Sequence, residues 1–270
     1  MPELPEVETT RLGITPHVVG RRVTRVLVRE PRLRWPVSEA LGQALTGQTI
    51  EAVERRAKYL LLRSPAGTVM IHLGMSGSLR VLDATVPPEK HDHIDLALEG
   101  GQVLRFRDPR RFGSVFWLVG DDSHPLLEEL GPEPLHEHFS GTHLFQCSRG
   151  RKTPVKVFLM NSQIVVGVGN IYANESLYRA GIRPTLAAGR ISRGRYDRLA
   201  VAVKEVLAEA IAAGGTTLQD FVREDGSPGY FRHDLKVYGR GGAPCARCMR
   251  ALTEIRLGQR TTVFCGRCQR

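Results

Sequence analysis

Two short stretches near the carboxyl end, Cys245-Ala246-Arg247-Cys248 and Cys265-Gly266-Arg267-Cys268, decide how that part of the chain folds. Each stretch is a Cys-x2-Cys pair, and sixteen residues separate the two pairs. The spacing matches the four-cysteine zinc pattern, in which four thiolates converge on the metal and the intervening residues form a hairpin. Because four thiolates leave no open position for water, the sequence predicts one structural Zn²⁺ and no catalytic metal.

The residues around these cysteines are strongly basic. The range 229–270 holds nine Lys and Arg residues against two acidic residues, and the whole chain of 270 residues carries a formal net charge of +10. A metal-pinned hairpin that is rich in arginine is suited to binding phosphate groups. The charge therefore indicates a polyanionic partner and favours nucleic acid over an anionic membrane, since no long basic amphipathic helix stands out.

Composition limits the class of protein and its compartment. Hydrophobic residues make up 41% of the chain, which is enough for two domains with real cores. No apolar run approaches the about 20 residues of a membrane span, and no basic stretch followed by an apolar run marks a signal peptide. Five cysteines without an export signal favour a reducing compartment. We therefore expect a cytoplasmic monomer that does not bind membranes.

Upstream of the zinc finger, the range 154–228 has the apolar spacing of helices. Tyr196, Leu199 and Val203 follow helical spacing, and Gly214-Gly215 is expected to end that helix. The sequence therefore predicts a helical domain here, followed by the finger at 229–270.

A turn inside this helical domain is a second phosphate-binding candidate. Gly167-Val168-Gly169-Asn170 joins two helical stretches, 155–163 and 171–180. The glycines allow a tight turn, which places Asn170 at a helix N-terminus. There its side chain and the free backbone N–H groups can hold a phosphate, or the side chain can simply cap the helix.

The first part of the chain, 1–130, has the pattern of a β-sandwich with flanking helices. Residues 1–18 read as a helix, and short strand-like runs such as Val23–Val28 follow up to about residue 119. Gly100-Gly101 is a hairpin signal. The His-, Gly- and Pro-rich stretch 131–153 is predicted to be a linker, so the fold class is α+β with two domains.

The opening residues Met1-Pro2-Glu3 suggest chemistry. Removal of Met1 is expected because proline is small, and it leaves Pro2 as a secondary amine. An α-amino group titrates near 8, against about 10.4 for lysine, so more of it is an uncharged nucleophile at neutral pH. Attack on an aldehyde-like carbon gives an iminium, and Glu3 is close enough to donate or relay a proton. The alternative is a plain helix start, with proline and acids in the first turn.

Six motifs, in order along the whole chain, resemble those of bacterial formamidopyrimidine-DNA glycosylase. They are Pro2-Glu3-Leu4-Pro5-Glu6-Val7-Glu8, Arg56-Ala57-Lys58-Tyr59-Leu60, His72-Leu73-Gly74-Met75-Ser76-Gly77, Asp108-Pro109-Arg110-Arg111-Phe112-Gly113, Gly167-Val168-Gly169-Asn170-Ile171-Tyr172-Ala173 and the four-cysteine finger of Cys245, Cys248, Cys265 and Cys268. The resemblance implies an N-terminal β-sandwich and a helix–two-turn–helix domain with the finger, and DNA in the cleft between the two domains.

The implied activity is base-excision repair of duplex DNA, with removal of oxidised purines such as 8-oxoguanine and formamidopyrimidines and cleavage at abasic sites. By this resemblance Pro2 attacks C1′ and forms a Schiff base, while Glu3 donates and relays protons. Lys58 matches the residue of β-elimination, and Arg260 matches that of δ-elimination. Since an arginine is a poor general acid, we expect Arg260 to clamp a phosphate first.

Further residues match the family's DNA contacts. Base flipping leaves a hole in the duplex, and the resemblance assigns its filling to Met75, Arg110 and Phe112. Arg110 and Phe112 project to one side if their segment is extended. The other matched DNA contacts are His72, His91, Arg151, Asn170 and Tyr238, and the lid over the flipped base begins near Thr216 and Thr217.

Two features outside these assignments have plain interpretations. His91-Asp92-His93 lacks a third and fourth ligand, so a polar loop is expected rather than a metal site. Cys147 lies outside the finger and is expected to be an inert thiol.

Two other functions remain open from the sequence. One is an endonuclease VIII-like glycosylase for oxidised pyrimidines, against which the Leu4-Pro5-Glu6-Val7 start argues. The other is a non-catalytic DNA-damage binder, which would tolerate a retained Met1 because a blocked Pro2 cannot form the iminium.

Overall fold

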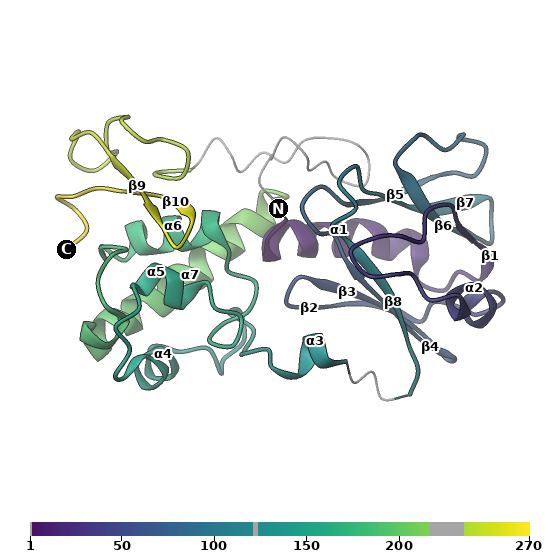
Figure 1. Ribbon diagram of the computed structural model, residues 1–270, viewed down its shortest axis with the longest axis horizontal. Helices are drawn as coiled ribbons and strands as arrows, with labels where there is room; N and C mark the ends of the chain where they lie inside the picture. The colour runs from purple at the N-terminus through teal and green to yellow at the C-terminus, as the bar shows by residue number, and fades with distance from the viewer. Residues whose placement is uncertain (1, 121–123, 216–234) are drawn as a thin grey trace. The chain divides into compact units, whose positions relative to one another are not determined.

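The computed structural model describes residues 2–120, 124–215 and 235–270. The chain divides into two units, 1–128 with 213–232 and 129–212 with 233–270 (Figure 1). The first unit contains α1 (Leu4–Val18), β1 (Val23–Val28), α2 (Ala40–Leu45), β2 (Ala52–Arg56), β3 (Tyr59–Ser64), β4 (Gly67–His72), β5 (Ser78–Asp83), β6 (Asp92–Leu98), β7 (Gln102–Arg107), β8 (Ser114–Leu118) and α3 (Pro125–Glu128).

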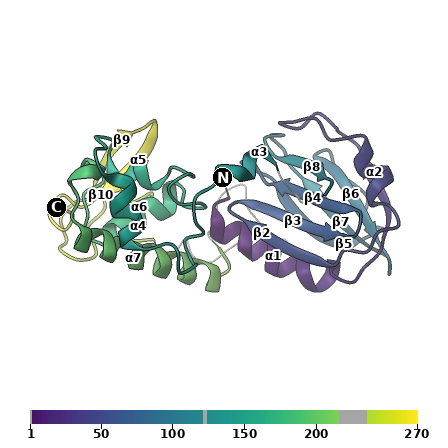
Figure 2. The ribbon, with the colours of Figure 1, turned by 90° about the horizontal axis from the view of Figure 1, so that it is seen from below.

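The first unit is a sandwich of two antiparallel sheets (Figure 2). The strand orders are β1-β6-β7-β5 and β2-β3-β4-β8. Helix α1 contacts β2 and β5, which are edge strands of different sheets, and α2 contacts the opposite edges at β1 and β8. One helix therefore closes each open side of the sandwich. The predicted β-sandwich with flanking helices is confirmed.

The core of this unit lies between the sheets and is almost entirely aliphatic. Val7, Ile14 and Val18 of α1 are each at most 1% exposed and join it, in agreement with the face predicted for residues 1–18. A smaller cluster of Leu61, Met70 and Leu118 lies on the outer face of the second sheet, and Leu127 of α3 packs against it. Burial of both faces explains why β3 and β4 read as continuous apolar runs rather than alternating ones.

Helix α1 begins with a reciprocal cap. Glu3 is the N-cap in an extended conformation, and its carboxylate accepts the Glu6 backbone N–H while the Glu3 N–H donates to Glu6 Oε2 at 2.8 Å. This capping box satisfies two donors that the first turn would leave unpaired. Pro5 fits the first turn because its missing N–H has no partner there anyway. The helix-start interpretation is therefore correct for these residues, and it places Pro2 and Glu3 at the positive end of the helix.

The second unit is helical and carries a two-stranded hairpin (Figure 1). Its elements are α4 (Gly141–Ser148), α5 (Val155–Leu159), α6 (Asn170–Arg179), the 3₁₀ turn η1 (Ala188–Arg190), α7 (Arg193–Ala212), β9 (Thr253–Leu257) and β10 (Arg260–Phe264). Helix α7 packs against both α4 and α6, and α6 also contacts β10. The hairpin therefore rests on a helix that the helical core already fixes.

The stretch predicted as a linker, 131–153, differs from that expectation because it contains α4. Ser140 caps this helix by accepting the His143 N–H at 3.2 Å, and α4 then packs on α7. Eight residues span little more than two turns, too few for a clear apolar period. The stretch belongs to the second unit rather than joining two units.

Candidate functional site

Lys58 lies in the turn between β2 and β3, and that turn is held from α1. Ala57 before it has φ +54°, a left-handed conformation that costs energy in any residue other than glycine. The Ala57 carbonyl accepts from Arg55 Nη1 at 2.9 Å, and Arg55 Nε pairs with Glu8 of α1 at 2.8 Å. Burial raises the pKa of Glu8, but hydrogen bonds from Arg11 and Arg55 outweigh burial and leave it below its usual value. The ionised Glu8 thus anchors the Lys58 turn.

His72 at the end of β4 lies beside this turn. It pairs with Tyr59 across the sheet, and the two ring centroids are 4.9 Å apart. Burial, together with the positive charges of Lys58 and Arg34, lowers the pKa of His72 to about 4. Its Nδ1 accepts the Gly74 N–H at 3.1 Å, so in the neutral ring the proton is on Nε2. His72 is therefore a neutral N–H donor at pH 7, which suits a phosphate oxygen.

The residues predicted to fill the duplex lie on two loops of this unit. Met75 is partly exposed in the loop after β4, whereas Arg110 and Phe112 are exposed in the loop after β7. The prediction that Arg110 and Phe112 project to one side required an extended segment. The second loop is not extended, because Arg111 has φ +56° and turns the chain. The two side chains still meet, since the Arg110 guanidinium lies 4.8 Å from the Phe112 ring centroid. Phe112 is 46% exposed, unusually high for a phenylalanine.

The His91-Asp92-His93 segment is less loop-like than predicted. Asp92 and His93 are buried in β6, and Asp92 lies 3.5 Å from Arg105 in an ion pair. His93 Nε2 bonds the Asp108 carbonyl oxygen at 2.8 Å. Only His91 precedes the strand, partly exposed. Among the described residues, no metal-binding group includes these histidines.

In the second unit, Arg260 is the first residue of β10, at the tip of the finger hairpin. The tip turn is Gly258-Gln259, with φ +56° and +60°. Asn170, the first residue of α6, donates from Nδ2 to the Thr261 carbonyl oxygen at 3.1 Å. Its neighbour Gly169, rather than Asn170, is the N-cap of α6. The structure thus brings Asn170 next to Arg260, as neither local pattern alone indicated.

Two buried charged residues that sequence reasoning missed hold this region together. Lys156 of α5 is fully buried, and its Nζ donates to the Thr261 carbonyl oxygen at 3.0 Å and to Thr262 Oγ1 at 2.7 Å. Glu175 of α6 accepts three backbone N–H groups, from Lys236 at 2.9 Å, Val237 at 2.9 Å and Tyr238 at 2.8 Å. Buried charges with complete hydrogen bonding rigidify their surroundings. A single Lys or Glu in a helix gives no sequence signal of such a role.

The remaining predicted residues have varied positions. Tyr238 is partly exposed, with its backbone fixed by Glu175, and Arg151 is exposed, with Nε donating to the Cys147 carbonyl oxygen at 2.7 Å. Cys147 Sγ lies 3.9 Å from the ring nitrogens of His143. Thr216 and Thr217 lie outside the described residues.

The four finger cysteines form a compact cluster. The Sγ atoms of Cys245, Cys248, Cys265 and Cys268 all lie within 4.8 Å of one another. Backbone N–H groups point at two of the sulfurs, and Tyr178 Oη lies 3.2 Å from Cys245 Sγ. Donors aimed at sulfur are what ligating thiolates require. The donor set and its spacing fit one structural zinc.

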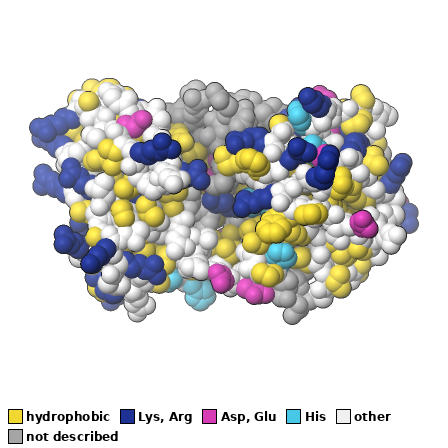
Figure 3. All heavy atoms as spheres, in the orientation of Figure 1, with side chains coloured by type: hydrophobic (Ala, Val, Ile, Leu, Met, Phe, Trp, Pro, Cys, Tyr) yellow, Lys and Arg dark blue, Asp and Glu magenta, His cyan; other side chains and the backbone are white. Residues whose placement is uncertain are grey.

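The surface agrees with a polyanionic partner. On the face shown in Figure 3, Lys and Arg side chains are much more frequent than Asp and Glu. No helix in the described part of the chain has the length and apolar character needed to cross a membrane.

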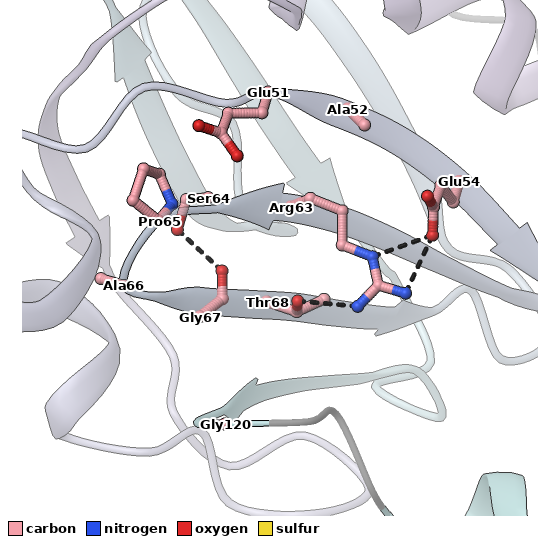
Figure 4. Close-up of a pocket in the computed structure, with 10 residues that line it drawn as sticks. All are labelled: Glu51, Ala52, Glu54, Arg63, Ser64, Pro65, Ala66, Gly67, Thr68 and Gly120. Atoms are coloured by element: carbon pink, nitrogen blue, oxygen red, sulfur yellow. Dashed lines mark hydrogen bonds and ion pairs between the residues drawn. The ribbon is translucent and has the colours of Figure 1, made fainter.

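A depression at the far end of the β3–β4 hairpin is not part of this site. It has a volume of about 510 Å³ and is lined by Glu51, Glu54 and Arg63 among others (Figure 4). Arg63 is already paired with Glu54 at 2.9 Å. Lys58 and His72 lie at the opposite ends of the same two strands.

Comparison with known proteins gives matches over nearly the whole chain. The N-terminal domain of formamidopyrimidine-DNA glycosylase matches residues 1–115, and the H2TH domain of the same enzyme matches residues 130–222. The zinc finger found in FPG and IleRS matches residues 242–270. The range 130–222 includes the stretch predicted as a linker, in agreement with the position of α4.

Individual relatives are similar from end to end. The formamidopyrimidine-DNA glycosylases of Alkalilimnicola ehrlichii and Stutzerimonas stutzeri are 61% and 60% identical, with 100% of each chain covered. The MutM (FPG) protein from Thermus thermophilus has a TM-score of 0.89 at 40% identity, over 99% of this chain and 98% of that one. A Lactococcus lactis FPG mutant bound to Fapy-dG-containing DNA has a TM-score of 0.92 at 33% identity, over 100% of both chains. The chain therefore belongs to the formamidopyrimidine-DNA glycosylase family.

Proposed function

We propose that Pro2 and Glu3 perform the chemistry of this family member on damaged DNA. As a formamidopyrimidine-DNA glycosylase, the chain is a DNA glycosylase and abasic-site lyase that acts on oxidised purines and abasic sites. The observation that carries the residue assignment is the start of α1. There, Pro2 is buried beside the Glu3–Glu6 capping box, at the positive end of a helix. The dipole of that helix disfavours a protonated amine, which favours the nucleophilic form.

The reaction then proceeds through a Schiff base. With Met1 removed, the Pro2 nitrogen attacks C1′ of the damaged nucleotide, the bond to the base breaks, and the base leaves with a proton that Glu3 supplies. The Pro2 nitrogen then loses its proton and the C1′–O4′ bond of the sugar breaks. O4′ takes a proton that Glu3 relays, and an iminium between Pro2 and C1′ results. The iminium acidifies the hydrogens on C2′, and β-elimination expels the 3′ phosphate. A second, δ-elimination expels the 5′ phosphate.

Other residues assist these steps. Lys58 is offered by a turn that Arg55 and Glu8 fix in place, which supports its proposed role in proton transfer during elimination. His72 offers a neutral Nε2–H to a phosphate. Arg260 is proposed to clamp a phosphate from the finger tip, where Asn170 binds the carbonyl oxygen of the next residue, Thr261. Tyr238, Arg151 and His91 are proposed to contact DNA, as is the segment of Thr216 and Thr217.

Met75, Arg110 and Phe112 are proposed to fill the space that the extruded nucleotide leaves. Methionine adapts its shape, and an exposed phenylalanine can wedge between base steps. The stacked Arg110 guanidinium keeps its donors available for the orphaned base.

The partner is proposed to be double-stranded DNA with an oxidised purine or an abasic site, bound by a single copy of the chain. Structures of Lactococcus lactis relatives are complexes with Fapy-dG and abasic-site DNA. The relatives are bacterial, so we propose action on the nucleoid in the cytoplasm.

Replacing the proposed nucleophile tests the function. Pro2→Gly should retain binding to damaged duplex yet lose excision by about 100-fold or more, because the secondary amine and its fixed ring are gone. The measurement is single-turnover cleavage of duplexes that carry 8-oxoguanine, a formamidopyrimidine or an oxidised pyrimidine. Pro5→Ala is the matched control, since it changes a proline of the same helix start and should keep excision.

Either of two results would contradict the proposal. Excision by Pro2→Gly at the rate of the unaltered protein would refute the assignment of Pro2 as the nucleophile. Preferential cleavage of the oxidised pyrimidine by the unaltered protein would favour the endonuclease VIII-like specificity.

A further inference from the structure

The two loops that carry the proposed void-filling residues are joined by a buried hydrogen bond. The first loop, 73–77, contains Met75, and the second, 108–113, contains Arg110 and Phe112. Ser76 Oγ donates to Asp108 Oδ1 at 2.7 Å. Ser76 is 5% exposed and Asp108 is fully buried, so water does not compete for this bond. A hydrogen bond to a buried carboxylate is stronger than one between neutral groups.

The same carboxylate also fixes the second loop. Asp108 Oδ1 accepts the Arg110 N–H at 3.3 Å, and Oδ2 accepts the Gly113 N–H at 2.8 Å. The Arg110 N–H also lies 3.2 Å from Ser76 Oγ. Asp108 itself is fixed from β6, because its carbonyl oxygen bonds His93 Nε2 at 2.8 Å. One side chain therefore binds both ends of the second loop and reaches the first.

The backbones of the two loops also touch directly. A Cβ at Gly74 would lie 2.4 Å from the carbonyl carbon of Phe112 and 2.4 Å from the Gly113 nitrogen. Gly74 has φ +64° as well, so both the conformation and the contact require glycine. With no space between them, the loops cannot shift independently.

We propose that Ser76 and Asp108 are positioning residues that make the two loops one rigid unit, so that Met75, Arg110 and Phe112 enter the duplex together. This inference rests on the proposed function. Unstacking a base step costs a few kcal/mol, which the contacts of the inserted side chains help to offset. Loops that are ordered before binding contribute the full free energy of their contacts. Loops that become ordered during binding lose part of that free energy to the entropy cost of ordering.

The test compares two serine variants. Ser76→Ala removes the bond between the loops. Ser64→Ala removes a bond of the same 2.7 Å length, from Ser64 Oγ to the Gly67 carbonyl oxygen, at the opposite end of β4 (Figure 4). For each variant, single-turnover rates are measured on a duplex with 8-oxoguanine opposite cytosine and on the same duplex with a preformed abasic site.

Ser76→Ala should slow excision of 8-oxoguanine by about fivefold to tenfold, the range expected for one buried hydrogen bond. Cleavage of the abasic site should change by less than about twofold, because no base remains to be extruded and the Pro2 chemistry is intact. Ser64→Ala should leave both rates close to those of the unaltered protein. A 2-aminopurine next to the lesion should report slower unstacking in Ser76→Ala alone.

Asp108→Asn provides a second variant. Its amide can keep the Gly113 N–H on its oxygen only by turning its NH2 toward Ser76 Oγ, so the bond between the loops loses its charged acceptor and reverses direction. The ratio of excision to abasic cleavage should therefore fall in the same direction as in Ser76→Ala. The inference is overturned if Ser76→Ala and Ser64→Ala have the same ratio, or if Ser76→Ala loses both reactions equally. By contrast, an unaltered protein inactive on both duplexes would overturn the proposed function itself.

Discussion

Four described residues other than glycine have a positive φ, and each adjoins a residue of the candidate site or the metal cluster. Ala57 precedes Lys58, Arg111 separates Arg110 from Phe112, Gln259 precedes Arg260, and Met249 follows Cys248. Each such conformation costs on the order of 1–3 kcal/mol and persists only where the surroundings impose it. Here the imposing contacts include the Arg55 bond to the Ala57 carbonyl oxygen. At the scale of single residues, backbone strain is concentrated beside the residues of the candidate site and of the metal cluster, where it helps to fix the direction of their side chains.

None of this strain was predictable from the sequence. Alanine, arginine and glutamine carry no preference for left-handed conformations, so only long-range contacts select them. The Ser76–Asp108 bond was equally hidden, because it joins residues 32 positions apart. Pro2 and Glu3 were candidates from the opening residues themselves and Lys58 from motif resemblance, and the structure adds how Glu3 and the Lys58 turn are held.

His72 makes the stability of the protein depend on pH in a specific window. Its folded pKa of about 4 lies below the ordinary value of 6.5, so the unfolded chain binds the proton more tightly. Stability from this residue is therefore present above pH 6.5 and is lost as the pH falls toward 4. Relative to His72→Gln, which does not titrate, the unaltered protein should lose about 1–3 kcal/mol between about pH 7 and about pH 4.5.

Urea unfolding of both proteins at the two pH values measures this difference. The free energy of unfolding of the unaltered protein minus that of His72→Gln should fall on acidification. If this difference stays constant or rises, His72 is not held neutral by its surroundings.

At the scale of elements, apolar pattern and spacing were informative where an element is long or fully buried. The predicted strand Val23–Val28 coincides with β1, and the finger pairs form the predicted cysteine cluster. Pattern failed for α4, whose eight residues are ordered by the Ser140 cap and by packing on α7. The helix predicted at 155–163 is shorter, since α5 ends at Leu159.

Helix α6 links the helical core to the metal cluster through Tyr178. Its hydroxyl lies 3.2 Å from Cys245 Sγ, and the Arg247 guanidinium lies 4.5 Å from its ring centroid. Tyr178→Phe should lower zinc affinity by about tenfold, the typical effect of losing an outer hydrogen bond to a ligand. Competition with a chromophoric chelator measures it.

Tyr196→Phe is the matched control for this change. Tyr196 is, like Tyr178, a buried tyrosine of the second unit, but its hydroxyl donates to the Ala188 carbonyl oxygen at 2.9 Å and does not contact a cysteine. The zinc affinity of Tyr196→Phe should equal that of the unaltered protein. Equal zinc loss from the two variants would mean that Tyr178 acts through general packing and not through the sulfur.

At the scale of the whole molecule, the sequence predicted the class of partner better than the arrangement of the domains. The net charge of +10 indicated a polyanion without any structural information. The division into two units falls near residue 128, close to the predicted limit at 130, but the second unit begins there directly instead of after a linker. Charge adds along a chain, whereas a domain boundary depends on which distant residues pack together.

The central claim is that the Pro2 nitrogen forms the covalent bond to damaged DNA. Borohydride reduction during turnover of a duplex with 8-oxoguanine opposite cytosine traps that bond, and mass mapping locates it. The account predicts a cross-link on the N-terminal peptide at Pro2, with Met1 absent. A cross-link at Lys58 or another lysine, or tight binding without any cross-link, would contradict it.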